Sequence, residues 1–174
     1  MTPTRRPIPN PVLPLLALAA ALPAAAADPC LVGRWEPVGN AAGEWMQRNA
    51  PGLQVQAAQQ GTLEFLADGT YVAGGSGQAQ VAATQAQAEV RDLRFQARGT
   101  WSTEGTTLVL QPTAGSMDGT MRIQGPAGRT IEVPMPRGAA QPQRLQYACS
   151  SDGLQTRMAV RNATPVVQRY RRLP

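Results

Sequence analysis

The sequence contains no lysine and no histidine, and all 16 of its basic residues are arginine. Without histidine, neither a Ser-His-Asp nor a Cys-His relay can be assembled, and an imidazole zinc site is excluded. Without lysine, the chain has neither a Schiff-base amine nor the phosphate-binding lysine of a P-loop. General acid–base chemistry would therefore depend on carboxylates, tyrosines or water.

The carboxylates show no catalytic spacing. Asp68, Asp118, Asp152 and Glu104 each precede a glycine, and acidic residues in that position are typical of turns. No pair of carboxylates has a spacing that suggests glycoside hydrolysis. We therefore expect no catalytic residues, no metal site, no cofactor and no enzymatic activity.

Long apolar runs are absent except near the N-terminus. Arg5 and Arg6 precede an apolar segment, Pro11 to Ala27, that ends in small residues before Asp28. A basic start, an apolar stretch and small residues at its end are typical of a cleavable signal peptide. The segment is short for a membrane span of about 20 residues. We expect residues 1–27 to be removed and residues 28–174 to form one periplasmic or secreted domain without a membrane segment.

Cysteine is scarce, with only Cys30 and Cys149 in the chain. Asp28 and Pro29 precede Cys30 where a lipidated cysteine would follow a small residue, so lipidation is not expected. Two cysteines in an exported chain are expected to pair. The bond requires the two Cα atoms to lie within about 7 Å. It would hold the start of the domain beside a late hairpin, as a closed sheet requires.

Residues 28–174, the expected mature chain, carry 14 arginines and 11 acidic residues, so their net charge is +3. The arginines are scattered along the chain, and only the terminal "RYRR" (Arg169 to Arg172) is a cluster. Nucleic-acid binding proteins gather their basic residues on one face. We therefore expect no nucleic-acid partner.

Short segments with alternating polar and apolar residues predict antiparallel strands. Three of them, Thr62–Gly74, Gly99–Leu110 and Arg144–Val160, carry an Asp-Gly or Glu-Gly pair where a hairpin would turn. Ser116–Gly125, with Asp118-Gly119 at its centre, could form another hairpin. About nine or ten short strands result, which is typical of a β-barrel or sandwich. Weaker strands are expected within Val90–Arg98, Arg129–Pro136 and Thr164–Arg172.

Three segments depart from the strand pattern. Ala41–Gly52 favours a short helix that ends at Pro51-Gly52. Gly77–Glu89 is rich in alanine and glutamine and is compatible with a loop, a helical turn or a polar edge strand. Gly125–Gln143 is rich in proline and glycine and predicts a long surface loop that contains one strand.

The order of several motifs resembles that of small bacterial lipocalin-like domains. "CLVGRWE" (Cys30 to Glu36) contains Gly-x-Trp, and "LEFLADGTY", "GTWSTEGTTLVL", "YACSSDGL" and "RYRR" follow in turn. The resemblance implies an all-β, antiparallel up-and-down barrel with one short helix. It also implies that Gly33, Trp35 and Arg169 plug one end of the barrel. The sequence departs from the family between residues 78 and 98, where two family motifs are not recognisable.

Two functions are compatible with these observations. The first is an exported, monomeric lipocalin-like module that binds a small apolar or amphipathic ligand, with Trp45, Met46 and Tyr71 as candidate contacts. The alternative is suggested by "YACSSDG" (Tyr147 to Gly153), which is similar to the Tyr-x-Cys strand of periplasmic lysozyme inhibitors. In that case the protein would inhibit a hydrolase (a lysozyme or a protease) or bind another envelope protein, through the loop at residues 125–143.

The mass of the exported protein tests both the processing and the disulfide. We expect an N-terminus at Asp28 and an intact mass lower, by two hydrogen atoms, than that of the reduced chain. Intact mass spectrometry before and after reduction measures both quantities. Free thiols in protein taken from the periplasm would contradict the expected pairing.

Overall fold

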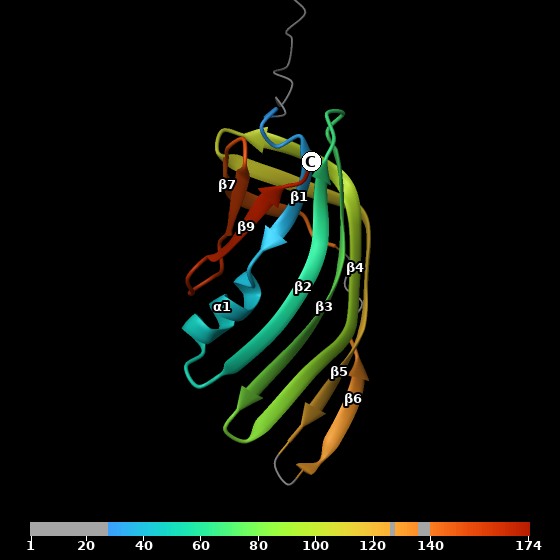
Figure 1. Cartoon of the computed structure of the whole chain (residues 1–174), viewed down its shortest axis with the longest axis vertical. Coiled ribbons are helices and arrows are strands. Elements are labelled where there is room, and N and C mark those ends of the chain that lie inside the picture. Colours follow the sequence, from blue (N-terminus) through green and yellow to red (C-terminus); the bar gives the residue numbers. More distant parts are fainter. Residues whose placement is uncertain (1–27, 126–127, 136–139) are drawn as a thin grey trace, which may run out of the picture.

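The computed structural model describes residues 28–125, 128–135 and 140–174, which form nine strands and one helix (Figure 1). The expected signal peptide, residues 1–27, lies outside the described residues. The elements are β1 (Gly33–Val38), α1 (Ala41–Asn49), β2 (Gln54–Phe65), β3 (Thr70–Ala83), β4 (Ala86–Glu104), β5 (Thr107–Gln124), β6 (Thr130–Pro134), β7 (Gln143–Cys149), β8 (Gly153–Met158) and β9 (Val166–Arg172).

Eight strands close into an antiparallel barrel. Each of β1 to β5 pairs with the next, β5 pairs with β7, β7 to β9 follow in order, and β9 returns to β1. β6 lies outside this ring and pairs only with the far end of β5. The predicted up-and-down barrel with a single short helix is therefore confirmed, and α1 begins at the predicted residue.

The strands differ greatly in length. β1, β7, β8 and β9 contain six or seven residues, whereas β2 to β5 contain 12, 14, 19 and 18. The long strands continue past the ring as a curved sheet (Figure 1). We call this part of β2–β6 the extension; it comprises residues 54–60, 76–83, 86–94, 116–124 and 130–134. The expectation of uniformly short strands was wrong.

The extension corrects one expectation from the sequence and decides another that was open. Asp118-Gly119 does not turn the chain, because β5 runs on through it between β4 and β6. The segment left open at Gly77–Glu89 is the paired hairpin of β3 and β4. Both segments gain ladder hydrogen bonds from the strands on either side of them, and local composition does not reveal this pairing.

The extension has one apolar and one polar face. Side chains alternate between the two faces along each strand. Residues paired across the sheet therefore form rows, and each row is either mainly apolar or mainly polar. Two apolar rows are Val55, Val81, Ala88, Ile123, Ile131 and Ala57, Ala79, Val90, Met121, Val133. The intervening row on the other face is Gln56, Gln80, Glu89, Arg122, Glu132. The apolar rows continue the inner face of the barrel.

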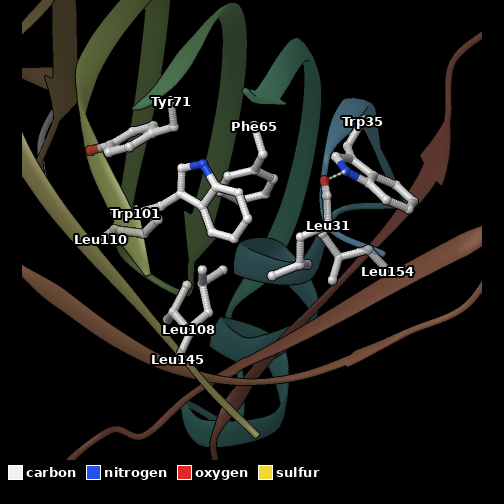
Figure 2. Packing of buried hydrophobic residues seen from close by; sticks show 9 residues of the cluster. All are labelled: Leu31, Trp35, Phe65, Tyr71, Trp101, Leu108, Leu110, Leu145 and Leu154. Carbon is white, nitrogen blue, oxygen red and sulfur yellow. Dashed lines mark hydrogen bonds between the residues drawn. The ribbon is translucent and has the colours of Figure 1, made fainter. Parts of the chain in front are cut away.

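The hydrophobic core fills the barrel end that lies away from the extension. Phe65 and Trp101 meet edge to face with their ring centroids 5.1 Å apart (Figure 2), a favourable aromatic geometry. Both side chains point into the barrel. The buried cluster consists of Leu31, Trp35, Phe65, Tyr71, Trp101, Leu108, Leu110, Leu145 and Leu154.

Trp35 closes this end, but its cationic partner is Arg172 and not the predicted Arg169. The Arg172 guanidinium carbon lies 4.3 Å from the centroid of the Trp35 ring, within range of a cation–π contact. Arg169 faces outward because strand alternation places Tyr170 and Arg172 on the inner side of β9. Sterics explain why the first residue of Gly-x-Trp is glycine. A Cβ on Gly33 would lie 2.6 Å from Arg172 Nη1.

The predicted disulfide is confirmed. Cys30 and Cys149 are bonded, with their Cα atoms 6.1 Å apart and a sequence separation of 119. The bond joins the segment before β1 to the end of β7. A nearby hydrogen bond has the same effect, because the Tyr147 hydroxyl donates to Asp28 Oδ2 at 2.8 Å. The start of the domain is thus fixed to the barrel at two points.

Replacing both cysteines by serine (C30S/C149S) should lower the free energy of unfolding by about 4 to 5 kcal/mol. The reason is that the bond restricts a loop of more than 100 residues in the unfolded chain. Urea unfolding of the variant and of the oxidised wild type measures the difference. Coincident unfolding curves would contradict a stabilising role for the bond.

Candidate functional site

The open end of the barrel contains an apolar cleft of about 250 Å³. The strands of the ring supply most of its wall, and the segment before β7 supplies the rest. The lining residues are Pro37, Gly61, Thr62, Leu63, Tyr71, Ala73, Phe95, Ala97, Leu110, Pro112, Ala140, Gln141, Gln143, Leu145 and Tyr170. The cleft therefore lies directly below the core, at the opposite end from Trp35.

Small residues create the space in the cleft. Ala73 and Ala97 are cross-strand neighbours, and their short side chains leave the barrel unfilled at this level. Phe95 lies against the glycines next to them. A Cβ on Gly75 would approach Phe95 Cε1 to 2.9 Å and would come still closer to the Gln60 carbonyl oxygen. Gly75 thus allows the Phe95 ring to lie flat on the sheet as one wall of the cleft.

The cleft is electrically neutral. None of its lining side chains is charged, and its polar groups are amides, hydroxyls and backbone. Burial raises the pKa of the Tyr71 hydroxyl and also that of Tyr170, so both phenols are uncharged at neutral pH. A buried ligand charge would find no opposite charge here, and burying an unpaired charge is costly. The chemistry of the cleft therefore suits an uncharged group.

The apolar lining continues onto the extension. Phe95 pairs across the sheet with Met117, and Leu93 follows on the same face opposite Gly77. Most side chains of the two apolar rows are half-buried, while Ile131 at the β6 edge is 52% exposed. An apolar surface thus leads from the cleft along the inner face of the extension.

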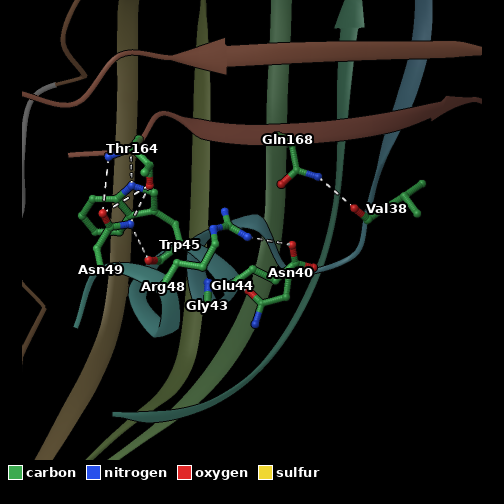
Figure 3. Close-up of polar contacts among 9 residues, drawn as sticks. All are labelled: Val38, Asn40, Gly43, Glu44, Trp45, Arg48, Asn49, Thr164 and Gln168. Atoms are coloured by element: carbon green, nitrogen blue, oxygen red, sulfur yellow. Dashed lines mark hydrogen bonds and ion pairs between the residues drawn. The ribbon is translucent and has the colours of Figure 1, made fainter. Parts of the chain in front are cut away.

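One of the three predicted ligand contacts lies in the cleft. Tyr71 lines it, whereas Trp45 and Met46 on α1 do not. The Trp45 indole nitrogen donates to the Thr164 carbonyl oxygen at 2.6 Å, and Asn49 Nδ2 donates to the Thr164 hydroxyl at 2.8 Å (Figure 3). Trp45 therefore fixes α1 to the loop before β9.

Sequence reasoning missed three larger contributors to the cleft, namely Phe95, Leu110 and Tyr170. The only local signal was the alternation that places each on the inner face of its strand. In β4 that alternation is interrupted on the N-terminal side of Phe95, by a bulge between Arg91 and Arg94, and in β5 by a second irregularity opposite Arg98 and Gly99. A bulge shifts the inner and outer positions by one, so alternation alone does not show which residues of β4 before Arg94 and of β5 beyond Pro112 share a face with the cleft residues.

Two further findings concern metals and membranes. Within residues 28–125, 128–135 and 140–174, no group of three or more Cys, Asp or Glu side chains is placed to hold a metal ion. The helix in this part of the chain is too short to cross a membrane.

Comparisons of the chain with protein-family models, with curated proteins and with solved structures find no match.

Gly75→Ala should destabilise the protein and disturb the cleft, because the new methyl group would displace Phe95 or separate β2 from β3. Gly74→Ala is a matched control, since its Cβ would have only ordinary contacts, the nearest at 3.5 Å. We expect a loss of about 1 to 3 kcal/mol for Gly75→Ala and a much smaller change for Gly74→Ala. Thermal unfolding measures both, and equal effects would contradict the packing described.

Proposed function

We propose that this protein is a lipocalin-like binding protein that holds a small, uncharged apolar or amphipathic molecule at the open end of its barrel. The observation that carries the proposal is the 250 Å³ apolar cleft below a fully packed core. Ligand sites are typically concave, mainly apolar and provided with a few polar groups that set orientation. Tyr71, Gln143 and Thr62 supply such groups here.

The shape of the site favours an elongated ligand. The cleft is slightly smaller than the roughly 300–1,000 Å³ of typical small-molecule pockets, so it would enclose one end of a larger molecule. The remainder would lie on the apolar rows of the extension, where Val90 and Met121 are neighbours. A polar end of the ligand would then stay in solvent, away from the neutral cleft.

The alternative function, inhibition of a hydrolase through a loop, gains no specific support. Part of the segment at residues 125–143 lies outside the described residues. Its described strand, β6, completes the edge of the extension. We therefore retain ligand binding as the single proposed function.

Native mass spectrometry of the exported protein, purified without detergent, tests the proposal. We expect an adduct of small-molecule mass that dissociates when the protein unfolds. Ala73→Phe should abolish the adduct, because the ring would occupy the cleft. Val72→Phe is the matched control, since Val72 is the next residue on β3, is 51% exposed and faces solvent.

Two fluorescent probes test the charge preference separately. The uncharged N-phenylnaphthylamine should bind, and Ala73→Phe should displace it. The anionic anilinonaphthalene sulfonate should bind at least about tenfold more weakly, because its sulfonate would lack a counter-charge in the cleft. Near-ultraviolet circular dichroism of both variants verifies folding. Equal binding by the Ala73→Phe and Val72→Phe variants would contradict the proposed site.

A further inference from the structure

A second concave site lies outside the barrel, between α1 and the outer face of β8 and β9. It is a groove of about 470 Å³. Three arginines line it, Arg48 from α1, Arg157 from β8 and Arg169 from β9. Glu44 is the one acidic residue in the lining, and Gln155 adds an amide. The groove is therefore polar and carries a net positive charge, unlike the neutral cleft.

The sheet register brings two of these arginines close together. Gln155 is opposite Arg169, and Arg157 is opposite Val167, so the two arginines are diagonal neighbours on the same face. Diagonal neighbours in an antiparallel pair are about 7 to 8 Å apart at the backbone, within reach of long side chains. Two guanidinium groups can thus converge on a single ligand.

The charge of this pair is not compensated within the described part of the chain. Several other arginines have carboxylate partners: Arg171 pairs with Glu36, Arg144 with Glu104 and Arg91 with Glu89. In the groove, Glu44 lies 3.7 Å from Arg48. Among residues 28–125, 128–135 and 140–174, neither Arg157 nor Arg169 has a carboxylate partner. An anion in the groove would relieve their mutual repulsion.

We propose that this groove binds a phosphate-type oxyanion through Arg157 and Arg169, assisted by Arg48. Guanidinium groups present a planar fork of donors that matches phosphate oxygens, and the Gln155 amide can donate a further hydrogen bond. The anion is either free phosphate or a phosphate group carried by an envelope lipid, since both present the same oxygens.

The groove is separate from the cleft. On β1, Pro37 lines the cleft and its neighbour Val38 lines the groove. On β9, Tyr170 lines the cleft and its neighbour Arg169 lines the groove. The wall formed by β1 and β9 therefore stands between the two sites. The anion site does not depend on the proposed ligand, and either site can be tested without the other.

Titration of the oxidised protein with inorganic phosphate, followed by ¹H–¹⁵N NMR, tests the proposal. We expect saturable shifts of the Arg157, Arg169 and Arg48 signals. The R157Q/R169Q variant should bind phosphate at least about tenfold more weakly, because two charge-assisted contacts are lost. The control R94Q/R98Q removes the same charge from the outer face of β4 and should remain within about twofold of the wild type.

A third variant gives an effect of opposite sign. Glu44→Gln removes the carboxylate that competes for Arg48, so it should strengthen phosphate binding by about two- to fivefold. Vesicles of phosphatidylglycerol, with phosphatidylcholine as control, distinguish the two sources of phosphate. Binding to phosphatidylglycerol that R157Q/R169Q abolishes would indicate a lipid headgroup, and binding of inorganic phosphate alone would indicate the free ion.

Two results would overturn the proposal. One is an equal loss of phosphate binding in R157Q/R169Q and R94Q/R98Q. The other is a set of shifts that never saturates and vanishes uniformly with added salt. Either would show that the arginines only contribute to a general positive field.

Discussion

The contact between Arg172 and Trp35 is the constraint on which the rest of the barrel depends. The Arg172 guanidinium covers the Trp35 ring and also donates to the carbonyl oxygens of Cys30 and Val32 at 2.6 and 2.8 Å. Its Nε reaches the Ser151 carbonyl oxygen at 2.9 Å. One side chain thereby joins the last strand, the segment before the first strand and the β7–β8 turn. The ring is closed where its two terminal strands meet.

This closure also determines where the barrel can hold a ligand. Trp35 is fully buried, and its indole nitrogen donates to the Leu31 carbonyl oxygen at 2.8 Å. The large side chains next to it, Phe65 and Trp101, fill the same end. The small residues Ala73 and Ala97 lie further along the inner face, and they leave the volume of the cleft on the side of the extension. The cleft and the apolar face that follows it are consequences of this uneven distribution of side-chain size.

Sequence reasoning predicted the parts of the fold that local chemistry specifies. Asp68-Gly69 and Glu104-Gly105 form the expected turns because glycine provides the positive φ that they require. The same reasoning failed at Asp118-Gly119, where pairing on both sides of β5 outweighs the turn preference. It was also undecided at Gly77–Glu89, since alanine gives only a weak hydrophobic signal and favours strands little.

The functional residues were harder to predict than the fold. The cysteines were paired correctly because a chain with two cysteines that is expected to be exported allows a single intramolecular pairing. Arg169 was chosen over Arg172 because the terminal arginines are indistinguishable until the facing of β9 is known. Trp45 was predicted to contact a ligand, but it lies outside the cleft, and its indole nitrogen donates to the Thr164 carbonyl oxygen. The cleft itself combines strands from the whole length of the chain, and their register is a property of the closed ring.

The arrangement of long and short strands has a consequence for the order of folding. The hairpins of β2 to β5 join neighbours in sequence, so their loop-closure entropy is small. Pairing of β1 with β9, and of Cys30 with Cys149, must wait for the end of the chain. A newly made chain therefore passes through an interval in which the meander exists as an open sheet while Cys30 is still a thiol. During that interval Cys30 has no partner within its own chain, so the disulfide becomes possible only when Cys149 at the end of β7 is in place.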